Sequence, residues 1–163
     1  MVDPDDVLVV AAAHRLKLIR TDQWPMVAAV LVAEGFEGDA LVEVAALSRS
    51  ASGWQLDQLV PRLLNELGAP ELEVEQAGDI AARLLARSIG GPDHPVIRAL
   101  APLAPSLDYP GGRIGQAYHL SEWLDCECHE GSTERAEADQ FEDELRGLPP
   151  LQIPAALAEA LTR

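Results

Sequence analysis

The chain has 163 residues, of which 48% are hydrophobic and only 4% aromatic, and its formal net charge is −15 at pH 7. This composition predicts a core of Ala, Leu, Val and Ile, which favours packed helices over a β-sandwich or barrel. The charge disfavours binding to nucleic acid or an anionic membrane surface and makes a basic protein the more natural partner. The sequence has no apolar run long enough for a membrane span and no signal-peptide pattern, so cytoplasmic residence is the expectation.

Capping residues, helix breakers and apolar periodicity predict five helices in the first 89 residues. Asp3-Pro4-Asp5-Asp6 combines an N-cap, a proline at the first helical position and acids near the positive end of the helix dipole. Gly35 and Gly68 are predicted to end the second and fourth helices. Pro61 predicts a kink in the fourth helix or the start of a new one. The five helices are expected at about 4–20, 22–34, 39–47, 54–67 and 71–88.

The segment 90–115 differs from the rest because ten of its 26 residues are Gly or Pro. It is expected to contain turns and one short helix near 96–100. Beyond it, helices are predicted at about 116–128, 133–146 and 154–161, the last docking back onto the core. The prediction is therefore an all-α array of about seven to nine helices. Its parts are an N-terminal helical body (1–89), a Pro/Gly-rich joint (90–115) and a C-terminal acidic helical unit (116–163) packed on the same domain.

Negative charge is concentrated in Glu122–Glu144, which has ten carboxylates and one basic residue, Arg135, within 23 residues. The stripe of Ala138, Phe141, Leu145 and Leu148 predicts that the second half of this segment is a folded helix. Carboxylates near a helix C-terminus are unfavourable by about 0.3–1 kcal/mol each. Because only Arg135 and Arg146 are nearby in the sequence, the placement of Glu142–Glu144 is expected to cost stability.

That cost favours a docking surface for a basic partner, although a solvated face that only keeps the protein soluble explains the same charge. The residues expected to contact the partner are Glu122, Trp123, Asp125, Glu127, Glu130, Glu134, Glu137, Asp139, Glu142, Asp143 and Glu144. No calcium-binding loop spacing is present.

His119, Cys126, Cys128 and His129 have the side-chain types of a zinc site, but their spacing is unfavourable. On a helix, two positions two residues apart point in nearly opposite directions, so Cys126 and Cys128 cannot bind one ion. Cys128 is instead expected in the core. A metal site stays open only if the helix ends before Cys126 and His119 folds over it. We therefore expect no metal, no cofactor and no catalytic residue.

No motif in the chain matches a known family, and the function is inferred from charge and size alone. In these two properties the chain resembles small acidic bacterial proteins that block basic toxins, and its preference for Arg over Lys is typical of high-GC bacterial genomes. The leading expectation is a non-enzymatic immunity protein or antitoxin that occludes a basic toxin, possibly a nuclease, electrostatically. The alternatives are a helical scaffold or assembly subunit, and a metal-binding sensor or enzyme that uses the His/Cys cluster.

Overall fold

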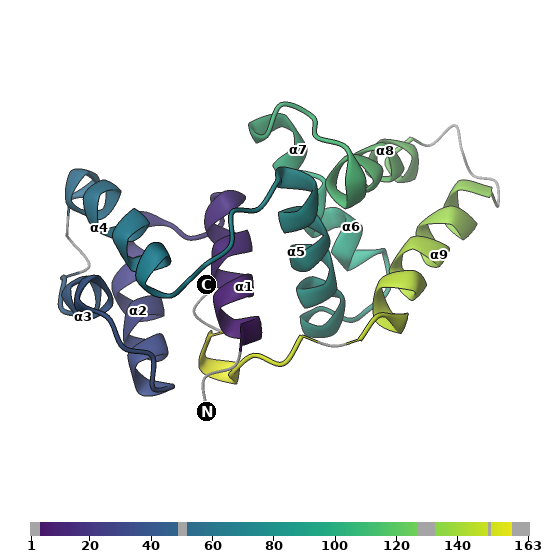
Figure 1. Cartoon of the computed structure of the whole chain (residues 1–163). Coiled ribbons are helices and arrows are strands. Elements are labelled where there is room, and N and C mark those ends of the chain that lie inside the picture. Colours follow the sequence, from purple (N-terminus) through teal and green to yellow (C-terminus); the bar gives the residue numbers. More distant parts are fainter. Residues whose placement is uncertain (1–3, 49–51, 127–132, 150, 158–163) are drawn as a thin grey trace. The chain divides into compact units, whose positions relative to one another are not determined.

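The computed structural model describes residues 4–48, 52–126, 133–149 and 151–157 (Figure 1). These ranges contain nine α-helices, a short 3₁₀ turn and no strand, which confirms the all-α prediction. None of the described helices has the length and hydropathy needed to cross a bilayer. The elements are α1 (Pro4–Arg15), the 3₁₀ turn η1 (Thr21–Gln23), α2 (Trp24–Ala33), α3 (Asp39–Ala45), α4 (Gly53–Glu66), α5 (Val74–Ser88), α6 (Pro95–Leu100), α7 (Leu103–Ser106), α8 (Gly112–Leu124) and α9 (Thr133–Gly147).

The chain divides into two compact units. Unit 1 takes its described residues from Met1–Leu72 and Gln152–Arg163, and unit 2 is formed by Glu73–Leu151. In unit 1, α3 packs against both α2 and α4, and the core includes fully buried Val10, Leu31 and Leu63. Leu157 is buried in the same core, so the last described residues do pack on the body of the protein as the sequence predicts.

Three helices of unit 1 end in the same backbone motif, in which one residue takes the left-handed conformation. In this motif two backbone N–H groups bond back to carbonyls of the last helical turn, and glycine is the usual left-handed residue. Gly35 (φ +93°) ends α2, Gly68 (φ +67°) ends α4, and Lys17 (φ +57°) ends α1. The predicted end of the first helix near Arg20 is therefore wrong, because the chain turns at Lys17.

Helix α4 runs without interruption through Pro61, so no new helix begins there. The helix starts at a capping box, in which Ser52 and Gln55 exchange side-chain and backbone hydrogen bonds. At its other end, Oε2 of Glu66 accepts a hydrogen bond from the backbone N–H of Ala40 at 2.8 Å. Glu66 thus satisfies an N–H at the start of α3, where Gly38 provides no side-chain cap.

Unit 2 packs α8 against α5, α6 and α9. Gly78 allows α5 and α8 to approach closely, because a Cβ there would lie 3.0 Å from the side chain of Ile114. The segment predicted as turns also contains α7 and the first turn of α8. Helix α8 begins at Gly112 and ends at Leu124, about four residues earlier at both ends than the sequence predicts.

Candidate functional site

Helix α9 packs one side into unit 2 and presents carboxylates on the other. Ala138, Phe141 and Leu145 are buried, as the apolar stripe predicts. The remaining positions of the helix carry four exposed acidic side chains. We call this set the α9 acidic face, and it consists of Glu137, Asp139, Asp143 and Glu144. Since its inner side is packed, α9 presents these acids on an ordered helix.

Glu142 does not belong to this face, because its side chain is only 3% exposed. Its Oε1 accepts a hydrogen bond from the backbone N–H of Val96 at 2.9 Å and lies 3.4 Å from that of Ile97. These N–H groups are in the first turn of α6, whose own N-cap residue, His94, makes no side-chain cap. The expectation that Glu142 contacts a partner is therefore corrected: Glu142 caps another helix of its own unit.

Arg146 holds Glu142 in place from the following turn of α9. One of its terminal nitrogens donates to Oε2 of Glu142 at 2.6 Å, and the other donates to Asp143 at 3.4 Å. The carboxylate of Glu142 is thus bonded on both oxygens, as a buried charge requires.

Arg113 of α8 neutralises a second acid of α9. Its side chain is 24% exposed, and its guanidinium lies 5.6 Å from the ring centroid of Phe141. Arg113 forms ion pairs with Glu144 at 3.4 Å and with Asp79 of α5 at 3.6 Å. A hydrogen bond from Gln140 and then the pairing with Arg113 lower the pKa of Glu144 below its usual value. The acids at the end of α9 are therefore compensated by basic groups, which corrects the expectation that their placement costs stability.

The acids at the end of α8 are also bonded within unit 2. Asp125 forms an ion pair with Arg98 of α6 at 3.0 Å. Glu122 accepts a hydrogen bond from the hydroxyl of Tyr118 at 2.8 Å, and this bond is the largest of the effects that raise the pKa of Tyr118 to about 12. Trp123, next to Glu122, is 42% exposed. Glu134 is half-buried, while Glu127 and Glu130 lie outside the described residues.

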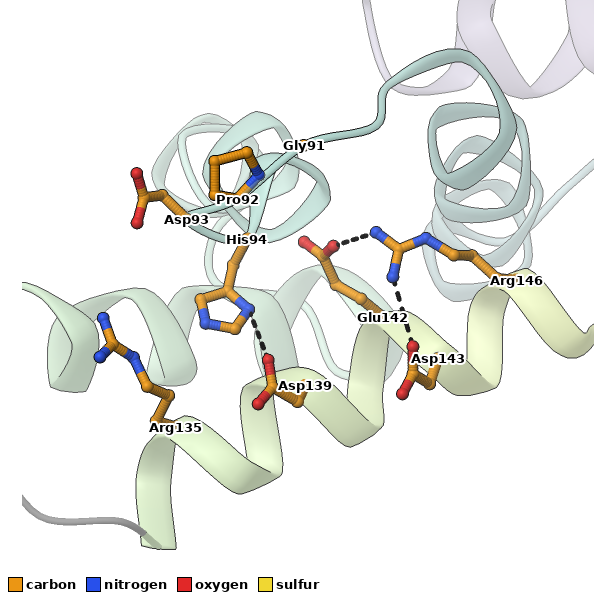
Figure 2. Close-up of a pocket in the computed structure, with 9 residues that line it drawn as sticks. All are labelled: Gly91, Pro92, Asp93, His94, Arg135, Asp139, Glu142, Asp143 and Arg146. Atoms are coloured by element: carbon orange, nitrogen blue, oxygen red, sulfur yellow. Dashed lines mark hydrogen bonds and ion pairs between the residues drawn. The ribbon is translucent and has the colours of Figure 1, made fainter.

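A pocket of about 440 Å³ lies between α9 and the loop before α6 (Figure 2). Its lining consists of Gly91, Pro92, Asp93, His94, Arg135, Asp139, Glu142, Asp143 and Arg146. His94 is buried, has a left-handed backbone (φ +52°), and places Nδ1 3.7 Å from Oδ1 of Asp139.

Four carboxylates and two guanidinium groups line this pocket, so its formal charge with a neutral His94 is −2. A cationic side chain suits this charge better than an anion does. The imidazole of His94 faces the carboxylate of Asp139 across the pocket (Figure 2). Among the described residues of the lining, none provides a hydroxyl or thiol nucleophile.

The His/Cys cluster lies only partly within the described residues. Helix α8 ends at Leu124, before Cys126. Cys128 and His129 lie outside the described residues, so the predicted core position of Cys128 falls there too. Within the described part of the chain, no three metal-ligating side chains come together.

Sequence reasoning named Arg146 but missed the basic residues on other elements that pair with the acids. The spacing of Glu142 and Arg146, four residues apart, could have indicated their ion pair. Nothing local indicates that Arg98, Arg113 or His94 face the acids, because they lie 27, 31 and 45 residues from their partners. No family model, curated protein or solved structure matches this chain.

Proposed function

We propose that the protein is a cytoplasmic, non-enzymatic binding protein that neutralises or regulates a basic protein partner. The most concrete form is a bacterial immunity protein or antitoxin that covers the basic cleft of a toxin, possibly a nuclease. The observation that supports this proposal is the α9 acidic face, which projects from a helix whose other side is buried. Glu142 is excluded from the binding residues. Glu122, Trp123 and Asp125 at the end of α8 remain in the proposed surface.

The charge of unit 2 supports electrostatic steering of such a partner. Residues 73–151 include 15 acidic and six basic side chains, a net charge of −9. Within the described residues, Glu137 is exposed and takes part in no ion pair. Asp143, although paired with Arg146, keeps 78% of its side-chain surface exposed. These two acids can therefore meet a basic partner without first breaking a buried contact, and their attraction should weaken with salt.

The test compares two charge-reversed proteins with the same change in net charge. One has Glu137→Lys and Asp143→Lys on the α9 acidic face. The matched control has Glu34→Lys and Glu37→Lys, two exposed acids of unit 1 that take part in no ion pair in the described part of the chain. The wild-type protein is used as bait to capture a basic protein from the source cells, and this partner is purified. Its affinity for the wild-type protein and for the two variants is then measured at low and at high salt.

We expect the unit 2 variant to lose at least tenfold in affinity while the unit 1 control retains it. An equal loss in both would mean that only net charge matters, and no loss in either would refute the proposed surface. The scaffold alternative predicts salt-insensitive association that tolerates both charge reversals. It is favoured by two exposed apolar side chains of unit 1, Trp54 (73% exposed) and Val42 (56% exposed).

A further inference from the structure

A second pocket, of about 400 Å³, lies within unit 1 between α4 and the residues that connect α1 to α2. Its lining includes Trp24, Leu56 and Val60, which belong to the core of the unit. His14 is also in the lining, with its ring in an edge-to-face contact with Trp24 at 5.6 Å. An apolar base with a few polar groups at its edge is typical of small-molecule sites.

Two opposite charges line this pocket without neutralising each other. Lys17 and Asp57 are both exposed, and neither takes part in an ion pair within the described residues. Lys17 is the one lysine of the sequence. A ligand that neutralises both charges would present an anionic and a cationic group next to an apolar body.

Lys17 holds a position that backbone geometry would assign to glycine. The equivalent positions at the ends of α2 and α4 are Gly35 and Gly68, whereas α1 ends at Lys17 with φ +57°. The left-handed conformation is unfavourable for a residue with a Cβ.

The backbone at Asp57 provides a further acceptor. Pro61 lies four residues after Asp57 within α4 and has no N–H, so it cannot donate the helical hydrogen bond to the carbonyl of Asp57. Both residues line the pocket. Asp57 thus contributes two acceptors, its side-chain carboxylate and a backbone carbonyl that lacks its helical donor. An ammonium group, which has three N–H donors, suits this pair of acceptors.

We infer that this pocket binds a free apolar α-amino acid as its zwitterion. The ligand carboxylate pairs with Lys17, its ammonium group bonds to the carboxylate and carbonyl of Asp57, and its side chain packs on Trp24, Leu56 and Val60. This site is in unit 1 and is independent of the proposed partner surface on α9. Its test therefore does not depend on that surface.

The experiment titrates leucine into a Trp54→Phe/Trp123→Phe protein, in which Trp24 is the remaining tryptophan, and follows Trp24 by fluorescence and by its indole NMR signal. Leucinamide, which lacks the carboxylate, and N-acetylleucine, which lacks the ammonium group, are titrated in parallel, with glycine as the ligand without a side chain. We expect saturable leucine binding and affinities at least tenfold lower for the three other compounds. Absence of saturation with leucine up to about 10 mM, a concentration that would detect even weak binding, would overturn the inference.

Two variants test separately which group of the ligand contacts Lys17 and which contacts Asp57. Lys17→Gln should weaken leucine and N-acetylleucine but leave leucinamide unchanged, because leucinamide has no carboxylate to lose. Asp57→Asn should weaken leucine and leucinamide but leave N-acetylleucine unchanged. Both variants change exposed side chains, and thermal unfolding checks that they fold. Equal weakening of all three ligands by both variants, or of none, would contradict the proposed orientation.

Discussion

Glu142 and Val96 are joined by a hydrogen bond of 2.9 Å from the backbone N–H of Val96 to the buried carboxylate, across 46 residues of sequence. This contact connects α9 to the first turn of α6, a helix of six residues. Because a helix this short has few backbone bonds of its own, its start depends on an acceptor from elsewhere. The most buried acid of α9 therefore has a structural role, and the exposed acids around it are the ones left for binding.

Replacing Glu142 by Ala should destabilise the protein by about 2–3 kcal/mol, because it removes charge-assisted bonds to Val96 and Arg146 and leaves a buried N–H without an acceptor. The matched control is Asp143→Ala, one residue away and largely exposed, which should change stability by no more than about 0.5 kcal/mol. Urea unfolding measures both. Similar losses in the two variants would contradict the capping role.

Replacing Lys17 by Gly should stabilise unit 1 by about 0.5–1 kcal/mol, because glycine adopts the left-handed conformation without a Cβ penalty. The reverse change, Gly68→Lys, should destabilise by about 1 kcal/mol, since no atom lies near the new Cβ and only the backbone conformation opposes it. Thermal unfolding of the two proteins tests whether the two substitutions change stability in opposite directions. A destabilised Lys17→Gly protein would show that Lys17 contributes to the fold rather than opposing it.

The lowered pKa of Glu144 predicts a change in stability at acid pH. A carboxyl group that is more acidic when folded stabilises the protein at pH values above its unfolded pKa, near 4.5, and loses that contribution as the pH falls through the folded value. Gln140→Ala removes the largest cause of the shift, the hydrogen bond from Gln140. The pKa of Glu144, followed by NMR, should rise in this variant. Stability at pH 7 should decrease slightly relative to stability at acid pH.

Tyr118 should ionise at unusually high pH because its hydroxyl donates a hydrogen bond to Glu122 that is lost on ionisation, and because the phenolate would then lie next to that carboxylate. In a Tyr109→Phe protein, which retains Tyr118 as its single tyrosine and loses the two smallest causes of the shift, ultraviolet titration should still give a pKa clearly above the ordinary value of 10.0. Adding Glu122→Gln should lower this pKa towards the ordinary value of 10.0. An ordinary pKa in the Tyr109→Phe protein would show that the hydrogen bond to Glu122 does not persist in solution.

Local signals predicted most helices correctly, because caps and breakers act within a few residues. Helix α2 ends before Gly35, and α9 occupies Thr133–Gly147, within one residue of the expected range. The end of α1 was missed because the left-handed residue there is Lys17, for which no sequence rule predicts that conformation. The burial of Glu142 was missed because it depends on α6, which lies more than 40 residues earlier.

The exposed acids of α9 were predicted from periodicity, whereas their pairing was not. The stripe of Ala138, Phe141 and Leu145 fixes which side of the helix is buried, and the remaining positions follow from helical spacing. The ion pair between Arg113 and Glu144 joins residues 31 positions apart and requires α8 to pack beside α9. Tertiary pairs of this kind decide how much of the formal charge is available to a partner.

Glu66 and Glu142 have the same relationship to a short helix in their respective units, since each lies on one helix and accepts a backbone N–H at the start of another. Helices α3 and α6 are therefore not self-contained pieces of sequence. A peptide of residues 73–126 would include all of α6 but lack the acceptor that completes its first turn. Such a fragment should show little helix at positions 95–100 until residues 133–149 are supplied, either on the same chain or as a second peptide.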